Sequence, residues 1–133
     1  MSKINDYAKF VDSTTSRQSK DFLAFINSTS ELEAKDNINV PRVLTAAIGM
    51  LAESGEFTEV LKKMVFQGKE FNEDNRFHMK RELGDILWYW IQGCIALGYT
   101  PDEVMDENIK KVEARYPNGF ETARSEVRAK NDI

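Results

Sequence analysis

The 133-residue chain contains one cysteine and one histidine. Cys94 has no second cysteine with which to form an intrachain disulfide, and its apolar neighbours predict a reduced core residue in a reducing compartment. So few soft ligands argue against a zinc site. Di-iron helical bundles use Glu-x-x-His motifs, whereas His78 lies four residues before Glu82. We interpret His78 as a surface or helix-end residue rather than a metal ligand.

The sequence also lacks an excess of basic residues, and it has no apolar run long enough to span a membrane. The net charge of −4 argues against a broad electrostatic contact with nucleic acid, so no nucleic-acid partner is expected. The longest weakly charged stretch, Leu83–Leu97, is too short to cross a bilayer and contains Asp85. No basic-then-apolar leader opens the chain, so we expect no secretory signal and no membrane partner.

Helical periodicity dominates what is present, and no alternating strand pattern occurs. The length and the 41% hydrophobic content predict one all-α domain. The predicted helices cover Ile4–Val11, a segment from near Ser16 through Ile26, Val40–Phe66, Arg76–Leu97 and Pro101–Arg115. Asn27–Asn39 is interpreted as a loop with a short helical piece, and Glu70–Asn75 as a loop. From Leu83 the fourth helix is apolar almost all round, which predicts burial at the centre of a bundle or an oligomer.

The clearest helix start in the sequence is Thr100-Pro101-Asp102-Glu103. Proline is favoured at the first helical position, where its missing N–H costs nothing. Thr100 and Glu103 have the spacing of a capping box, in which each side chain satisfies a backbone N–H of the other residue. The last predicted helix should therefore begin at Pro101.

Two pairs of carboxylates lie on the two longest predicted helices, Glu53 with Glu56 and Glu82 with Asp85. A spacing of three places each pair on one helical face, and two packed helices can bring all four together. The residues four positions further on are aromatic or aliphatic, not the lysine or arginine that often accompanies a solvated acid. Converging carboxylates repel one another unless a cation binds, and all-oxygen ligands suit Mg²⁺ or Mn²⁺. The pattern predicts a metal-dependent enzyme with a phosphorylated substrate.

Basic side chains near these acids are candidate phosphate ligands, because Mg²⁺ commonly binds substrate phosphates as well as protein. The candidates are Lys62, Lys63, Lys69, Arg81, Lys111 and Arg115, with Lys63 and Lys111 favoured. Lys63 lies beside Glu56 on the helical wheel. Tyr89 lies one turn beyond Asp85 on the acid-bearing face, so it is the aromatic residue best placed to stack on a base, and its tryptophan neighbours are interpreted as core.

These residues resemble the MazG-like family of all-α nucleoside triphosphate pyrophosphohydrolases. The mark of the family is E-x-x-E followed, on the next helix, by E-x-x-D, as in Glu53-x-x-Glu56 and Glu82-x-x-Asp85. Further similar blocks occupy residues 51–56, 82–89, 98–104 and 108–117. The resemblance extends over about residues 40–120, well over half of the chain.

The resemblance implies Mg²⁺-dependent hydrolysis of a nucleoside or deoxynucleoside triphosphate to the monophosphate and pyrophosphate, with Mn²⁺ as a substitute ion. It implies that the four acids hold the metal and that Asn108 and Lys111 bind the nucleotide or its phosphates. It also implies a four-helix-bundle-like, MazG-type fold assembled as a dimer or a dimer of dimers. Short relatives of this kind occur in bacteria and phages, so we expect a bacterial or phage-infected host cytoplasm.

The chain divides, on this interpretation, into N-terminal helices with a connecting segment at 1–39, catalytic helices at 40–120 and a charged tail at 121–133. Two alternatives stay open. One is a dUTP-specific or phosphoribosyl-ATP-specific pyrophosphohydrolase of the same superfamily. The other is a non-catalytic helical assembly module, in which the acids fix helix register or pair with basic residues across an interface. Metal binding separates the last alternative from the enzymes, because only a metal site is stabilised by the ion.

Overall fold

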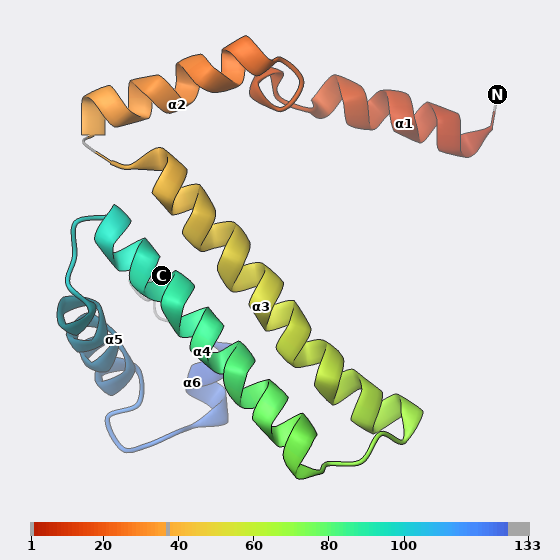
Figure 1. Cartoon of the computed structure of the whole chain (residues 1–133). Coiled ribbons are helices and arrows are strands. Elements are labelled where there is room, and N and C mark those ends of the chain that lie inside the picture. The colour runs from red at the N-terminus through yellow and green to blue at the C-terminus, as the bar shows by residue number, and fades with distance from the viewer. Residues whose placement is uncertain (1, 37, 128–133) are drawn as a thin grey trace. The chain divides into compact units, whose positions relative to one another are not determined.

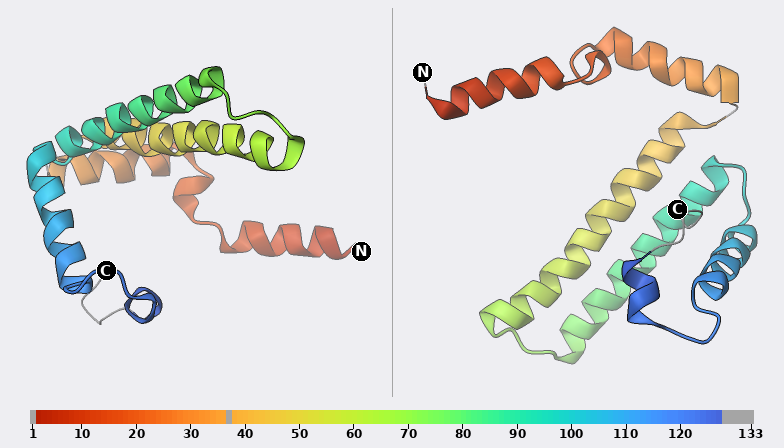
Figure 2. Two further views of the ribbon diagram at one scale, coloured as in Figure 1. Left: turned by 90° about the horizontal axis from the view of Figure 1, so that it is seen from below. Right: turned by 180° about the vertical axis from the view of Figure 1, so that it is seen from behind.

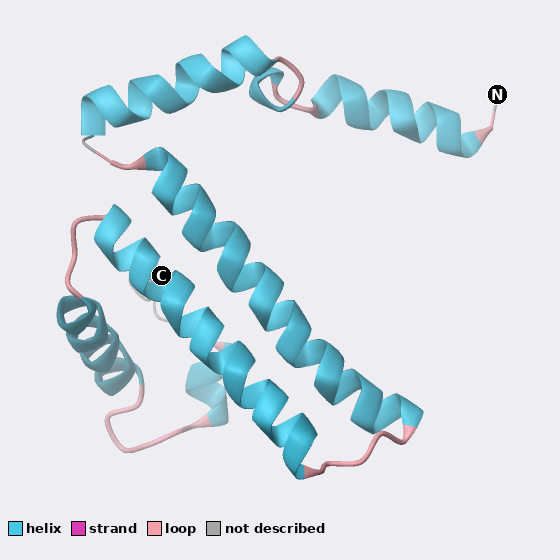
Figure 3. Cartoon of the chain, viewed as in Figure 1, coloured by secondary structure: helices cyan, strands magenta, loops and turns pink. Residues whose placement is uncertain are grey.

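The structure, a computed structural model, describes residues 2–36 and 38–127. Its regular elements over these residues are helices joined by short loops, with no β-strand (Figure 3), so the predicted all-α class is confirmed. No helix in this described part is long and apolar enough to cross a membrane. The chain forms two compact units, Met1–Val40 and Pro41–Ile133, and each is described by itself.

The first unit contains α1 (Lys3–Thr14), a single 3-10 turn η1 (Arg17–Ser19) and α2 (Phe22–Asp36). The predicted helix start near Ser16 is wrong, because the chain first makes the 3-10 turn and then begins α2 after Asp21. The Asp21 side chain caps this helix by accepting a hydrogen bond of 3.0 Å from the Ala24 N–H. The loop with a short helical piece predicted at Asn27–Asn39 is helical as far as Asp36, so its helical part is longer than predicted. Residues 27–36 contain no Gly or Pro and several good helix formers, so the helix continues, while Asn37 lies outside the described residues.

The second unit is built from α3 (Val40–Gln67), α4 (Glu73–Ala96), α5 (Pro101–Arg115) and the short α6 (Thr122–Glu126). The helix predicted for Val40–Phe66 is confirmed to within one residue. The charged tail predicted from residue 121 contains α6, and residues 128–133 of that tail lie outside the described part.

The fourth helix begins at Glu73, earlier than the sequence predicts. Asn72 is its N-cap, and the Asn72 side chain accepts a 3.0 Å hydrogen bond from the Asn75 N–H. Glu73 and Asp74 lie in the first turn, where the helix dipole favours negative charge. The polar stretch interpreted as a loop is therefore the capped start of α4.

Helices α3 and α4 run antiparallel and side by side in all views (Figures 1 and 2). Near one end of the pair the Arg42 Nε donates a hydrogen bond of 2.7 Å to the Gln92 Oε1. Further along, a Cβ placed on Gly93 would lie 3.6 Å from the Ala46 Cβ, which is ordinary van der Waals contact. The α3 residues of this face recur at alternating spacings of four and three, as for two helices packed along their length. They are Arg42, Ala46, Gly49, Glu53, Glu56 and Val60.

At Gly49 the backbone of α3 lies close to a side chain of α4. Any Cβ at this position would overlap the Tyr89 ring, so only glycine fits without a shift. The Tyr89 ring also packs edge-on against Trp88, with 4.9 Å between the ring centroids. This contact fixes the spacing of the two helices one turn before Glu53.

The turn between α4 and α5 follows its sequence signals. Gly98 adopts φ +77°, a left-handed conformation that favours glycine and ends α4. The predicted capping box is confirmed, because the Thr100 N–H donates to the Glu103 Oε2 at 2.7 Å and the Glu103 N–H donates to the Thr100 Oγ1 at 3.2 Å. From this turn α5 points away from the α3/α4 pair (Figure 2, left).

Many large apolar side chains of the second unit remain exposed. Leu83, Leu87 and Trp88 on α4 each keep 55% of their surface accessible. The prediction that this stretch is buried is therefore wrong for the single chain, and its burial in an oligomer stays a prediction. Cys94 is buried, as its apolar neighbours predicted.

Candidate metal centre

The structure brings three of the four predicted acids into one group across the α3/α4 interface. Carboxylate oxygens of Glu53, Glu82 and Asp85 all lie within 4.8 Å of one another. Glu53 comes from α3, one turn beyond Gly49, and the other two come from α4, before Tyr89. The close contact of Gly49 with Tyr89 therefore lies directly next to the acid group.

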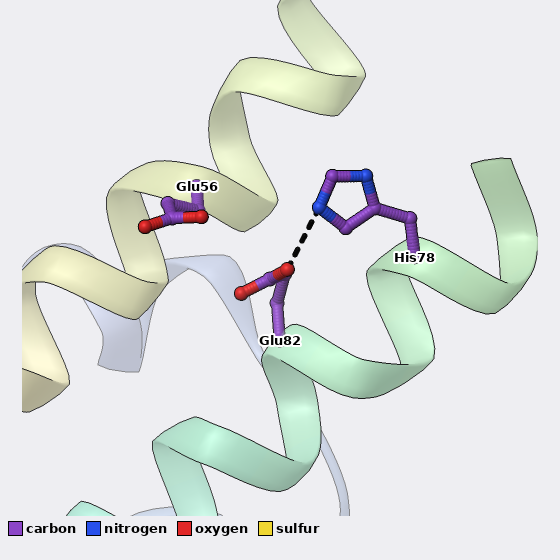
Figure 4. Close-up of side chains that lie close together, drawn as sticks. All are labelled: Glu56, His78 and Glu82. Atoms are coloured by element: carbon purple, nitrogen blue, oxygen red, sulfur yellow. Dashed lines mark ion pairs between the residues drawn. The ribbon is translucent and has the colours of Figure 1, made fainter.

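The fourth acid belongs to an overlapping group. Glu56, His78 and Glu82 also each offer a ligand atom within 4.8 Å of the other two (Figure 4). The His78 Nε2 lies 2.8 Å from the Glu82 Oε1 in an ion pair along α4. Glu82 is common to both groups, so it is the central acid of the site.

The sequence interpretation missed His78, which it placed at the surface. The side chain is half exposed, as expected, but its ring is directed at the central acid rather than at solvent alone. Its spacing of four from Glu82 makes the two residues neighbours on a helix, but in the sequence this spacing was weighed only against the di-iron motif.

The negative charges of the clustered acids repel one another. Glu82 is the buried member, with 8% of its side chain exposed, whereas Glu53 is half-buried and Glu56 and Asp85 are exposed. The pKa of Glu53 is raised first by burial, then by a side-chain hydrogen bond with Glu82 and by the charges of Glu56 and Asp85. Burial and the neighbouring negative charges both disfavour the ionised form of Glu53, so the cluster favours bound positive charge.

A divalent cation fits this donor set. Oxygen ligands suit Mg²⁺ and Mn²⁺, and opposite ligands of an octahedral ion with bonds near 2.1 Å lie about 4.2 Å apart. Adjacent ligands of the same ion lie about 3.0 Å apart, so oxygens within 4.8 Å of one another must draw closer by side-chain rotation when the ion binds. By contrast, Glu59 is neutralised on the surface by Lys63 at 3.1 Å and Lys62 at 3.9 Å.

Comparison with known proteins decides the family. The family model for the MazG nucleotide pyrophosphohydrolase domain matches residues 41–120, more than half of the chain. The chain belongs to the MazG family. The resemblance inferred from the paired acid motifs is thereby confirmed, and so is the MazG-type fold.

One relative of this MazG chain is the Gene 37 protein of Mycobacterium phage L5. It is 30% identical over 74 residues, which cover 54% of this chain and 64% of the relative. The chain thus spans less than two thirds of the length of the curated relative it matches. No solved structure matches the chain.

The MazG match includes all five residues predicted to bind substrate, and two of these share a cleft. Asn108 and Lys111 line a cleft of about 800 Å³ between α4 and α5, together with Trp90 and Tyr99. Among the described residues that line it, none is one of the four acids. The sequence interpretation missed Tyr99 and placed Trp90 in the core, because the spacing of residues within one helix does not show where a second helix leaves a cleft.

The other three predicted substrate residues lie outside that cleft. Lys63 is engaged by Glu59, as described above. The Tyr89 ring is packed on Gly49, and the Arg115 guanidinium lies 5.9 Å from the centre of the Tyr116 ring. Their predicted contacts with substrate stay predictions, and in this structure Tyr89 serves to pack the two acid-bearing helices.

Proposed function

We propose that the protein hydrolyses nucleoside or deoxynucleoside triphosphates to the monophosphate and pyrophosphate in a Mg²⁺-dependent reaction, with Mn²⁺ as a substitute. The observation that carries the proposal is the convergence of Glu53, Glu82 and Asp85 within 4.8 Å across two helices, with Glu56 in the overlapping group. All four acids lie within residues 41–120, which the MazG family model matches. The catalytic part is residues 40–120, with 1–39 and 121–133 outside it.

The four acids have two proposed roles, metal binding and acceptance of a proton. Glu82 and Asp85 from α4 and the acids of α3 are the proposed metal ligands. When bound, a divalent cation supplies neutralisation of the substrate phosphates and a more acidic water. One of Glu53 and Glu56 is the proposed base that accepts the proton of the attacking water.

The α4/α5 cleft is the proposed place of the nucleoside. Trp90 and Tyr99 are aromatic residues that can stack on a base, and Asn108 and Lys111 carry donors for sugar or phosphate oxygens. Glu103, Asp106 and Glu107 line the same cleft and repel phosphate groups that carry no bound cation.

Trp90 lies five residues beyond Asp85, about 7.5 Å along the helix and about 140° around it. Trp90 therefore lies on a different side of α4 from Asp85, and about 80° around the helix from Glu82. Movement of α5, or a second copy of the chain, would bring the cleft and the acids onto one nucleotide.

The exposed apolar surface supports the proposed assembly as a homodimer or a dimer of dimers. One chain supplies the α3/α4 pair, and a second pair would complete four helices. Ile48 and Leu51 on α3 are 67% and 76% exposed, and Trp88 on α4 is 55% exposed. Burial of such side chains contributes about 1.5–3 kcal/mol each, which favours association.

The proposal is tested by incubating the full chain in Mg²⁺ with canonical and modified NTPs and dNTPs, dUTP included, and with phosphoribosyl-ATP, and separating the products by ion-exchange chromatography. The expected products are a nucleoside monophosphate and pyrophosphate in equal amounts. Turnover confined to dUTP or to phosphoribosyl-ATP would identify the specialised reactions of the same superfamily. Release of orthophosphate and a nucleoside diphosphate would contradict the proposed reaction.

A further inference from the structure

We infer that His78 is a positioning residue for Glu82, holding the central carboxylate of the site in the orientation that binds metal; the inference rests on the proposed metal-dependent function. His78 lies one helical turn before Glu82 on α4, and its Nε2 lies 2.8 Å from the Glu82 Oε1 (Figure 4). A carboxylate oxygen accepts from an imidazole N–H at this distance.

Glu82 needs such a partner more than the other acids do. It is the buried member of the site and belongs to both groups of ligand atoms. Glu53 faces it from α3, and the charges around them favour any rotamer that carries one carboxylate away from the other. A donor bonded to one oxygen of Glu82 holds the side chain in place and leaves the second oxygen to face the ion. Hydrogen-bonded partners of metal ligands commonly act in this way.

The exposure of the His78 side chain distinguishes a role in positioning Glu82 from a role in packing the fold. About half of its side chain is accessible to solvent (51%), so its ring buries little apolar surface. Truncation should therefore cost the fold little, while it frees the carboxylate of Glu82. The oxygen preference of Mg²⁺ also places the imidazole behind the carboxylate rather than on the ion.

The experiment measures the affinity of the metal-free, untagged full chain for Mn²⁺ alone, from the free Mn²⁺ signal in electron paramagnetic resonance. His78→Ala removes the donor, and His78→Gln restores an amide N–H at a similar reach. Lys80→Ala, at an exposed position two residues along α4, is the matched control. We expect His78→Ala to weaken Mn²⁺ binding about 10–100-fold, as for other partners of metal ligands. His78→Gln should recover most of the loss, and Lys80→Ala should bind like the wild type.

Each other outcome is decisive. Equal Mn²⁺ affinity of the wild type and His78→Ala would overturn the positioning role while leaving the proposed function intact. Failure of the wild type to bind Mn²⁺ would overturn the proposed function and this inference together. Pulsed resonance adds a direct check, because His78 is the single histidine of the chain. A histidine nitrogen coupled to bound Mn²⁺ would show that His78 ligates the ion itself, which would also overturn the positioning role.

Discussion

At the scale of single residues, the four acids could be predicted as site residues from the sequence. The residues four positions after them are not the basic residues that often accompany solvated acids, whereas Glu59 has Lys63 there, and in the structure those two form an ion pair. His78 was not visible in the same way. A lone histidine is usually unremarkable, and only the rotamers that the fold selects direct its ring at Glu82.

Glu53 and Glu59, on the same helix, are predicted to affect stability with opposite signs. The pKa of Glu53 is raised in the fold, so native Glu53 releases its proton at a higher pH than the unfolded chain does. Its contribution to stability is therefore present below the ordinary carboxylate range, near pH 4.3, and is lost as the pH rises through the raised pKa. In metal-free protein at pH 7, Glu53→Gln should consequently raise the melting temperature.

Glu59 behaves in the opposite way, because its hydrogen bond and ion pair with Lys63 lower its pKa. Its contribution is present above the ordinary range and is lost as the pH falls through the lowered pKa. Glu59→Gln should therefore lower the melting temperature slightly at pH 7, as expected for an exposed ion pair. Calorimetry of both variants with EDTA and with Mg²⁺ checks the pair. Glu53→Gln should lose part of the stabilisation by Mg²⁺, and a drop in melting temperature for metal-free Glu53→Gln would contradict the strained acid cluster.

At the scale of elements, the helices with strong local signals were predicted to within one or two residues. The range of α3 followed from its apolar period, and the start of α5 followed from the capping box at Thr100. The start of α4 was missed because Asn72 caps it within a stretch too polar to show periodicity. The close contact of Gly49 with Tyr89 could not be predicted, because it depends on the register between two helices.

Gly49→Ala tests that register. Its Cβ would overlap the Tyr89 ring, so α3 and α4 must shift or the ring must move, at a cost of about 1–3 kcal/mol in the free energy of unfolding. Gly55→Ala is the matched control on the same helix, since nothing lies within 4 Å of its Cβ and it gains up to about 1 kcal/mol in helix propensity. Urea unfolding measures both. Equal stability of the two variants would show that the helices are not held this close at Gly49.

At the scale of the whole molecule, the sequence predicted an apolar α4 but could not say what covers it. Leu83, Leu87 and Trp88 remain half exposed in the single chain. Composition and hydrophobic periodicity show that a helix face is apolar. Which surface packs on that face depends on the assembly, which one sequence does not describe.

A homodimer or dimer of dimers predicts a solution mass of two or four times 15.3 kDa by light scattering. Leu51→Glu, on the exposed stripe of α3, should weaken association at least about tenfold, because it removes apolar burial and places a charge in the interface. Gln67→Glu adds the same charge at an exposed polar position of α3 and should leave the mass unchanged. A monomeric wild type at micromolar concentration would contradict the proposed assembly.

The most direct test is pyrophosphate release by the wild type, Glu82→Gln, Asp85→Asn and the surface control Glu59→Gln, each assayed with Mg²⁺ and with EDTA. We predict that the wild type and Glu59→Gln release pyrophosphate with Mg²⁺ and not with EDTA. Turnover by Glu82→Gln and Asp85→Asn should be reduced at least about 100-fold while their helical content is retained. Full activity of Asp85→Asn, or release that persists in EDTA, would contradict a metal centre built from these carboxylates.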